Sequence, residues 1–205
     1  WKIRVIKVTE VPVTYGGKAL HNIMNCLPAV LSTYFWRNIS IEDIRLALQT
    51  FVPSATQTPG RLNMFQFKHF QFLVDFAHNP AGLELLCDFV SKLEGEPKVG
   101  IISGTGDRRD EDIRELGRIS GKYFDEIIIR QDKNLRGRTA EEIVNLLVEG
   151  INETKPKDIP ITIIYNEKEA IMHAYNNAKT GSLITIMCDV VAEALDLIKE
   201  IKKKE

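Results

Sequence analysis

The sequence predicts an α/β fold: a three-layer sandwich around a mostly parallel six-stranded sheet whose first strand runs antiparallel to the others. Two observations carry this prediction. From residue 99 onward, short apolar runs alternate with amphipathic segments, as expected for strands and crossover helices in a sheet covered on both faces. Before them, two β-like runs are separated only by Lys68 and His69, which indicates a hairpin. The predicted arrangement is Rossmann-like.

The first residues are predicted to be extended. Residues 2–8 alternate basic and apolar side chains and predict a strand, and residues 11–15 are expected to continue extended as far as a turn at Gly16 and Gly17. The chain opens on Trp1, in what looks like the middle of a strand. We therefore expect it to be part of a longer protein.

Two helices are predicted next. Apolar residues at helical spacing predict a helix over residues 19–35, and Pro28 should bend it. Ser40 and Asp43 are spaced as a capping box for a second helix over residues 41–50. The stretch that follows is rich in Pro, Ser and Thr and is the best linker candidate. The predicted organisation is one body over residues 1–52, a linker over residues 53–60 and a second body over residues 61–205.

In the second body the strands and helices alternate. The hairpin strands are predicted at residues 62–67 and 70–76, and the later strands at residues 99–103, 126–130, 161–165 and 183–187. Helices are predicted at residues 81–93, 110–123, 140–151, 168–178 and 190–203. Helix starts are indicated by Asn79 before Pro80, by Thr139 with Glu142, and by Asn166 with Glu169.

The composition excludes several classes of protein. The 27 basic and 28 acidic side chains nearly cancel, which argues against nucleic-acid binding. No apolar run approaches the roughly 20 residues that cross a bilayer, so we expect no membrane partner. The three cysteines are scattered, and no Cys/His pair has metal-ligand spacing. We expect reduced, structural cysteines, no metal ligands, and a cytoplasmic location.

Polar clusters follow three of the predicted strands. They are residues 75–80, residues 103–109 and residues 131–138, and they contain Asp, His, Asn and several Arg. Ligands of open α/β sheets bind at the carboxyl ends of the strands, so we expect the three clusters to share one edge. Because Arg offers paired donors to phosphate or carboxylate, the sequence predicts a cleft for an anionic ligand beside a polar one.

Each cluster taken singly has a simpler interpretation. Gly104-Thr105-Gly106 lacks the third glycine of a dinucleotide fingerprint, and Gly16-Gly17-Lys18 lacks the full phosphate-loop pattern and is better explained as a turn. His78 could cap a helix. Arg108 and Arg109, beside three acids, could be a solvated helix start.

The order of the motifs is more specific than any one of them. In chain order they are His21-Asn22-x-x-Asn25, Pro59-Gly60-Arg61, Asp75-Phe76-Ala77-His78-Asn79-Pro80 and Gly106-Asp107-Arg108. This series resembles the Mur ligase superfamily, from the end of the ATP-binding central domain through the C-terminal domain. Gly106-Asp107-Arg108-Arg109-Asp110-Glu111-Asp112 and Leu135-Arg136-Gly137-Arg138 make it most similar to the Mur-type module of the cyanophycin synthetase family.

The resemblance implies an ATP-dependent amide ligase. Such enzymes activate a carboxylate as an acyl phosphate, which an amine then attacks; here arginine would be joined to the aspartate β-carboxylate of a growing polymer. The implied cofactors are ATP and Mg²⁺, held mainly by a central domain whose phosphate loop is not in this chain. The implied partners are arginine, an aspartate-containing polymer primer and the remaining domains, in a homo-oligomer. The chain alone is expected to be inactive.

The resemblance also implies site residues. Arg61 and Asp75 would contact the ribose or phosphates of ATP. The residues implied near the adenine are His21, Asn22 and Asn25, and those implied in catalysis are His78 and Asn79. The residues implied to bind the incoming amino acid are Asp107, Arg108, Asp132, Arg136 and Arg138. Two alternatives stay open: the C-terminal domain of a peptidoglycan- or folate-type Mur ligase, and a non-catalytic nucleotide or amino-acid binding module.

Overall fold

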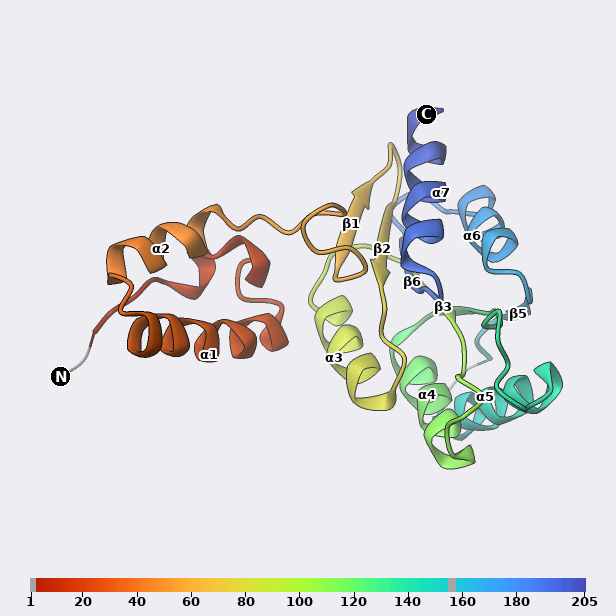
Figure 1. The fold of residues 1–205 in the computed structure, drawn as a ribbon. Helices are drawn as coiled ribbons and strands as arrows, with labels where there is room; N and C mark the ends of the chain where they lie inside the picture. Colours follow the sequence, from red (N-terminus) through yellow and green to blue (C-terminus); the bar gives the residue numbers. More distant parts are fainter. Residues whose placement is uncertain (1–2, 155–157) are drawn as a thin grey trace. The chain divides into compact units, whose positions relative to one another are not determined.

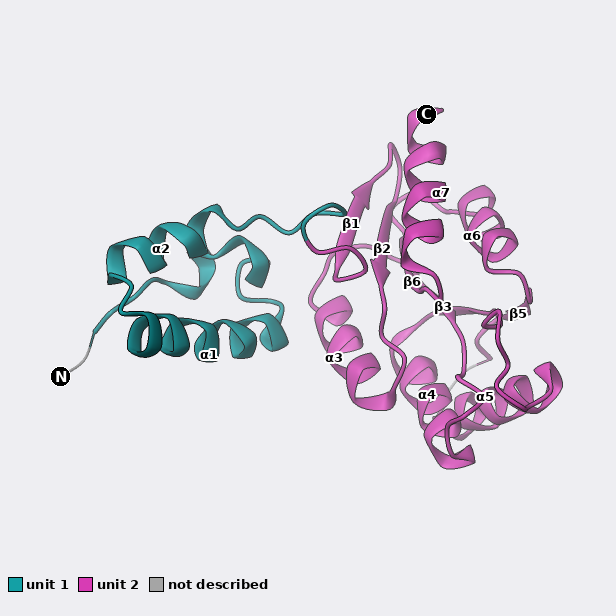
Figure 2. Cartoon of the chain, in the orientation of Figure 1, with its two compact units in different colours: residues 1–57 teal, residues 58–205 magenta. Residues whose placement is uncertain are grey.

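The computed structural model describes residues 3–154 and 158–205 and divides the chain into two compact units. Unit 1 comprises residues 1–57 and unit 2 residues 58–205 (Figures 1 and 2). Trp1 and Lys2, at the start of the predicted first strand, lie outside the described residues.

Unit 1 is helical, and the prediction of extended structure at its start is wrong. Residues 3–7 form no strand; the carbonyl of Val5 instead accepts a hydrogen bond of 2.7 Å from Arg45 Nε. Two short 3₁₀ turns follow, at Val8–Glu10 and Pro12–Thr14. The Thr14 hydroxyl donates to the carbonyls of Val8 and Val11, at 2.7 and 2.8 Å. These bonds close the turns where an extended segment was predicted.

The two predicted helices of unit 1 are confirmed. Helix α1 spans Leu20–Arg37 with Pro28 inside it, and helix α2 spans Ile41–Thr50. Ser40 caps α2 by accepting a hydrogen bond of 3.1 Å from the amide of Asp43. No residue of α1 is fully buried. A row at successive turns is between 47% and 76% exposed: Leu20, Met24, Leu27, Leu31 and Phe35. One side of α1 therefore presents an uncovered apolar face.

Unit 2 has the predicted α/β sandwich. Its strands are β1 (Asn63–Gln66), β2 (Gln71–Asp75), β3 (Lys98–Ile102), β4 (Glu126–Ile129), β5 (Ile161–Ile163) and β6 (Leu183–Met187). They lie in the order β1-β2-β6-β3-β4-β5, with β1 antiparallel to β2 and the other pairs parallel. The mostly parallel six-stranded sheet with an antiparallel first strand is thus confirmed.

Two groups of helices cover the sheet of unit 2 (Figure 1). One group packs side by side and contains α3 (Pro80–Ser91), α4 (Asp110–Tyr123) and α5 (Ala140–Thr154). The other contains α6 (Glu167–Asn176) and α7 (Val191–Lys203). The chain moves outward from β3 to β5 and then returns to place β6 between β2 and β3. A reversal of this kind opens a crevice at the carboxyl ends of the strands.

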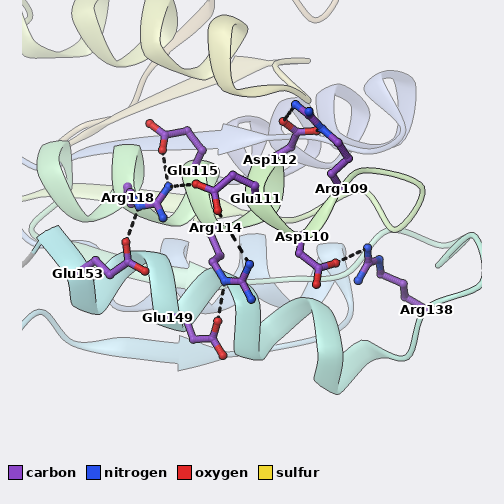
Figure 3. Close-up of polar contacts among 10 residues, drawn as sticks. All are labelled: Arg109, Asp110, Glu111, Asp112, Arg114, Glu115, Arg118, Arg138, Glu149 and Glu153. Carbon is purple, nitrogen blue, oxygen red and sulfur yellow. Dashed lines mark hydrogen bonds and ion pairs between the residues drawn. The ribbon is translucent and has the colours of Figure 1, made fainter.

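The backbones of helices α4 and α5 are in direct contact where glycines leave room. A Cβ on Gly150 would overlap the carbonyl oxygen of Arg114, and one on Gly117 would overlap that of Leu147. Ion pairs cross the rim of this contact (Figure 3). Arg118 pairs with Glu153 at 2.5 Å, and Arg114 pairs with Glu149 at 2.8 Å. The contact therefore fixes the spacing of α4 and α5, the two helices that follow two of the polar loops.

Candidate functional site

A strand-end basin of about 150 Å³ lies where four parallel strands of unit 2 end. Its lining comes from all three predicted polar clusters, which the structure brings to one edge as expected. These lining residues are Phe76, Ala77 and His78 after β2, Ser103, Thr105 and Arg108 after β3, and Arg130, Asp132 and Arg136 after β4. Cys188 and Asp189, after β6, complete the wall, and sequence reasoning did not single them out.

A buried arginine organises the floor of the basin. The side chain of Arg130 is only 2% exposed. Its guanidinium donates to the carbonyl of Met187 from both Nε and Nη2, and it pairs with Asp132 at 2.5 Å and Glu167 at 3.1 Å. One cation thus ties together the ends of β4 and β6 and the start of α6. Sequence reasoning missed Arg130 because it took it for the last residue of a strand; a charged residue that ends an apolar run was the available signal.

The carboxylates around Arg130 are held on their other sides as well. Asp132 accepts a hydrogen bond of 3.0 Å from the Ser103 hydroxyl. Glu167 accepts one of 2.6 Å from the amide of Asp189. Burial raises the pKa of Glu167, and the nearby Arg130 opposes that rise. Asp132 therefore faces the basin with its position fixed and much of its charge already balanced.

The two loops that flank the basin are locked to each other by Arg138. Its Nε and Nη2 donate to the carbonyls of Gly106 and Arg108, both at 2.9 Å, and it pairs with Asp110 at 2.7 Å. Gly106 also packs directly on the Leu135 carbonyl, where a Cβ would overlap it. Arg138 therefore joins the loop after β3 to the loop after β4, and its contact with an amino acid stays a prediction.

Two further arginines, Arg136 and Arg108, line the basin, and their contact with an amino acid stays a prediction. Arg136 lies on the exposed rim and pairs with Asp107 at 2.7 Å, a hydrogen bond that holds the pKa of Asp107 below its usual range. Arg108 lines the basin, and its buried Nε has no hydrogen-bond partner among the described residues. A buried donor without a partner is costly, so an anion that entered the basin beside Arg108 would relieve that cost.

Asp75 fastens the turn that carries Arg61. Asp75 is 7% exposed; its Oδ2 accepts a hydrogen bond of 2.9 Å from the amide of Leu62, and its carbonyl accepts one of 2.9 Å from the amide of Cys188. Burial raises the pKa of Asp75. Arg61 is exposed, with its guanidinium 6.0 Å from the centroid of the Phe76 ring. Nucleotide contacts of Arg61 and Asp75 stay predictions.

His78 and Asn79 have different surroundings. The exposed His78 makes a 3.0 Å hydrogen bond from Nδ1 to the Phe76 carbonyl. Because a carbonyl can only accept, Nδ1 carries the proton in this hydrogen bond, and in the matching neutral tautomer Nε2 is the acceptor. The Asn79 side chain accepts a hydrogen bond of 2.8 Å from the amide of Gly82 and caps α3, as expected of a residue before Pro80. Its predicted catalytic role stays a prediction.

Unit 1 holds the residues implied near adenine. Asn22 and Asn25 line a hollow of about 350 Å³ between α1 and α2. Asn22 Nδ2 donates to the Val13 carbonyl at 2.8 Å, and His21, beside it in α1, is half-buried. The hollow is largely apolar, and the adenine contact of His21, Asn22 and Asn25 stays a prediction.

Three properties of the described residues bear on the wider function. They contain no group of three or more His, Cys, Asp or Glu placed to hold a metal ion, so no residue here is assigned to Mg²⁺. None of their helices is both long and apolar enough to pass through a membrane. Cys26, Cys87 and Cys188 are free thiols.

Comparison with known proteins gives a consistent result. The family model described as "Mur ligase, glutamate ligase domain" matches residues 60–189. The chain is 39% identical over 199 residues to the cyanophycin synthetase of Synechocystis sp., covering 97% of this chain and 22% of that protein. It is thus about a fifth as long as that relative.

A peptidoglycan enzyme and a solved structure are also similar. The UDP-N-acetylmuramoyl-L-alanyl-D-glutamate–2,6-diaminopimelate ligase of Caldanaerobacter subterraneus is 30% identical over 169 residues, covering 82% of this chain and 33% of that protein. The fold matches that of Mycobacterium tuberculosis folylpolyglutamate synthase, solved with ADP and AMPPCP, with a TM-score of 0.66 and 20% identity. That match covers 88% of this chain and 40% of the other.

Proposed function

This chain belongs to the Mur ligase family, and from that premise we propose that it is the C-terminal part of an ATP-dependent ligase of the cyanophycin synthetase type. The observation that carries the proposal is the 39% identity over 97% of the chain. The proposed reaction joins the α-amino group of arginine to the β-carboxylate of an aspartate in a polymer. The alternative, a peptidoglycan-type ligase, has the weaker support of 30% identity over 82% of the chain.

In the proposed chemistry, a carboxylate oxygen attacks the γ-phosphorus of ATP, and ADP leaves. The arginine amine then attacks the carbonyl carbon of the acyl phosphate, inorganic phosphate leaves and the amine loses a proton. When bound, Mg²⁺ would offset the charge of the transferring phosphoryl group. His78 is a suitable acceptor for the amine proton because its Nδ1 is occupied by the Phe76 carbonyl and Nε2 is left as the acceptor.

The strand-end basin suits the incoming amino acid. Arg108, whose Nε has no hydrogen-bond partner in the described part of the chain, and Arg136 on the rim offer donors to an α-carboxylate. Asp132, held by Arg130 and Ser103, offers an acceptor to a cationic side chain. An arginine needs both kinds of partner, which is why we prefer it as the substrate.

We further propose that residues 1–52 are the end of the central, ATP-binding domain and that residues 53–60 link it to the C-terminal domain. The uncovered apolar face of α1 supports this assignment, because exposed rows of large apolar residues usually mark a contact surface. Free cysteines fit a reducing compartment, so we place the reaction in the cytoplasm.

The test uses the intact protein that carries this chain. Phosphate release and product mass would be measured with ATP, an aspartate polymer primer and one amino acid at a time. Arginine should be the amino acid that is incorporated, and the 205-residue chain alone should release no phosphate. Incorporation of diaminopimelate or glutamate in place of arginine would overturn the substrate and favour the alternative.

Arg61→Ala tests the nucleotide contact in the same assay. If Arg61 contacts ATP in a closed site, kcat should fall on the order of 100-fold, with little change in ATP affinity for the open form. The matched control is Arg109→Ala, because Arg109 is also exposed and pairs only locally with Asp112. Equal kcat values in the two variants would show that Arg61 does not contact ATP in the closed site.

A further inference from the structure

A second hollow lies beside the basin and has the opposite charge. It is a groove of about 790 Å³ between the loop after β4 and helices α6 and α7. Its lining carries six carboxylates and two lysines: Asp132, Glu167, Asp189, Glu193, Asp196, Glu200, Lys133 and Lys168. Lys133 is already paired with Glu193 at 2.5 Å. The groove, which we call the α6–α7 groove, is therefore suited to a cationic ligand.

The groove and the basin share part of their walls. Asp132 and Asp189 line both hollows, so a chain whose end lies in the basin could continue directly into the groove. Asp132 and Glu167 already face Arg130 in the floor. The carboxylates of α7 stand farther along the groove and belong to no such buried network.

Two observations besides the acidity point to a ligand. Gln131 lines the groove and is 7% exposed, yet its amide oxygen has no hydrogen-bond partner among the described residues. A buried acceptor without a hydrogen-bond partner favours a ligand that carries hydrogen-bond donors, and a guanidinium group carries several. Tyr165, also in the lining, is 50% exposed and offers an aromatic face on which a guanidinium can stack.

The length of the acidic row indicates more than one cation. Glu193, Asp196 and Glu200 follow one another at single turns of α7, and the eight residues from first to last span roughly 10 Å. Glu193 already pairs with Lys133 at 2.5 Å, and Asp196 lies 3.6 Å from Lys199, both at the exposed surface. One amino-acid side chain would contact the row at a single turn only. A polymer with several guanidinium groups would meet it at more than one turn.

We propose that the α6–α7 groove binds the arginyl side chains already present on the growing polymer, next to the point of addition. This inference rests on the proposed function, since it requires a polymer that carries arginine. The groove then orients the polymer end toward the basin by charge and stacking, and it favours primers whose preceding residues are already arginylated.

The double variant Glu193→Gln with Glu200→Gln tests the groove in the intact enzyme. Both residues are exposed, so the fold should be retained. The KM for a defined aspartate polymer that carries arginyl side chains should rise about tenfold, as expected for the loss of two exposed charge contacts. The KM for free arginine and the kcat at saturating primer should not change, and a primer without arginyl groups should bind as before.

The control is Glu42→Gln with Glu94→Gln, which removes two exposed carboxylates outside the groove and should leave every constant unchanged. Glu200→Lys is a second test variant with a larger expected effect. An unchanged KM for the arginylated primer would overturn the proposal, and so would a rise in the KM for free arginine instead. If no primer supports arginine-dependent ligation even in the unaltered enzyme, the proposed function itself is wrong and the groove proposal falls with it.

Discussion

The two units of this chain differ in how completely their helices and strands bury apolar side chains. In unit 2, α3 buries five residues within 12, and all five residues of β6 are buried beneath the helices. In unit 1, α1 is longer, with 18 residues, yet none of them is fully buried. The comparison shows that a helical pattern and a completed core are separate properties: the pattern of α1 forms the helix, while its apolar face stays uncovered.

Arg130→Met should give the largest effect and should confine it to unit 2. Removal of the cation leaves Asp132 and Glu167 without their shared ion-pair partner and leaves the Met187 carbonyl without its guanidinium donor. The free energy of unfolding of unit 2 should fall by about 3–5 kcal/mol. Urea unfolding followed by hydrogen exchange, read separately for each unit, measures it.

Arg114→Met is the control for Arg130→Met, because Arg114 makes its ion pair with Glu149 on the surface of the α4–α5 contact. Its effect should be much smaller. Equal losses in the two variants would show that burial of the arginine does not decide its contribution, and the contrast between core and surface would lose its basis.

Gly150→Ala should give the next largest effect. The added methyl group would overlap the Arg114 carbonyl, so α4 and α5 must move apart. The expected loss is about 2–3 kcal/mol in unit 2, despite the better helix propensity of alanine. Gly82→Ala in α3 is the control, since its nearest neighbour would be Asn79 Oδ1 at 3.3 Å. Thermal unfolding should separate the two variants clearly; similar midpoints would mean that the α4–α5 contact yields easily.

Leu31→Lys should have the smallest effect on stability, and it tests directly whether the apolar face of α1 is uncovered. Leu31 is 56% exposed on the uncovered face of α1, so the free energy of unfolding of unit 1 should change by no more than about 0.5 kcal/mol. Ile44→Lys, at a position that is 4% exposed, should unfold unit 1. Circular dichroism with hydrogen exchange distinguishes them. A large loss from Leu31→Lys would mean that the face is covered within this chain.

Much of unit 2 could be predicted from the sequence because each of its layers has a distinct pattern. The apolar runs and the amphipathic stretches fall within a few residues of the observed strands and helices, and α4 was predicted at its observed bounds. The start of unit 1 was not predicted. Its alternating residues looked like a strand, but Arg45 and Thr14 take up the backbone groups that a neighbouring strand would need.

The candidate site was predicted in part, for a topological reason. The order of strands in a sheet cannot be predicted from local sequence patterns. The insertion of β6 between β2 and β3 brings Cys188 and Asp189 to the basin. The roles of Arg130 and Arg138 were missed because both depend on partners in other segments: the Met187 carbonyl for one and the Gly106 carbonyl for the other.

The glycine contact between α4 and α5 has a consequence for protein engineering. Each helix begins where one of the two loops beside the basin ends, and Arg138 and Gly106 interlock those loops. A single loop grafted from a relative would therefore face a second loop whose contacts do not match it. The unit of exchange is the pair of loops together with both helices, so residues 103–154 should be transplanted as a single segment.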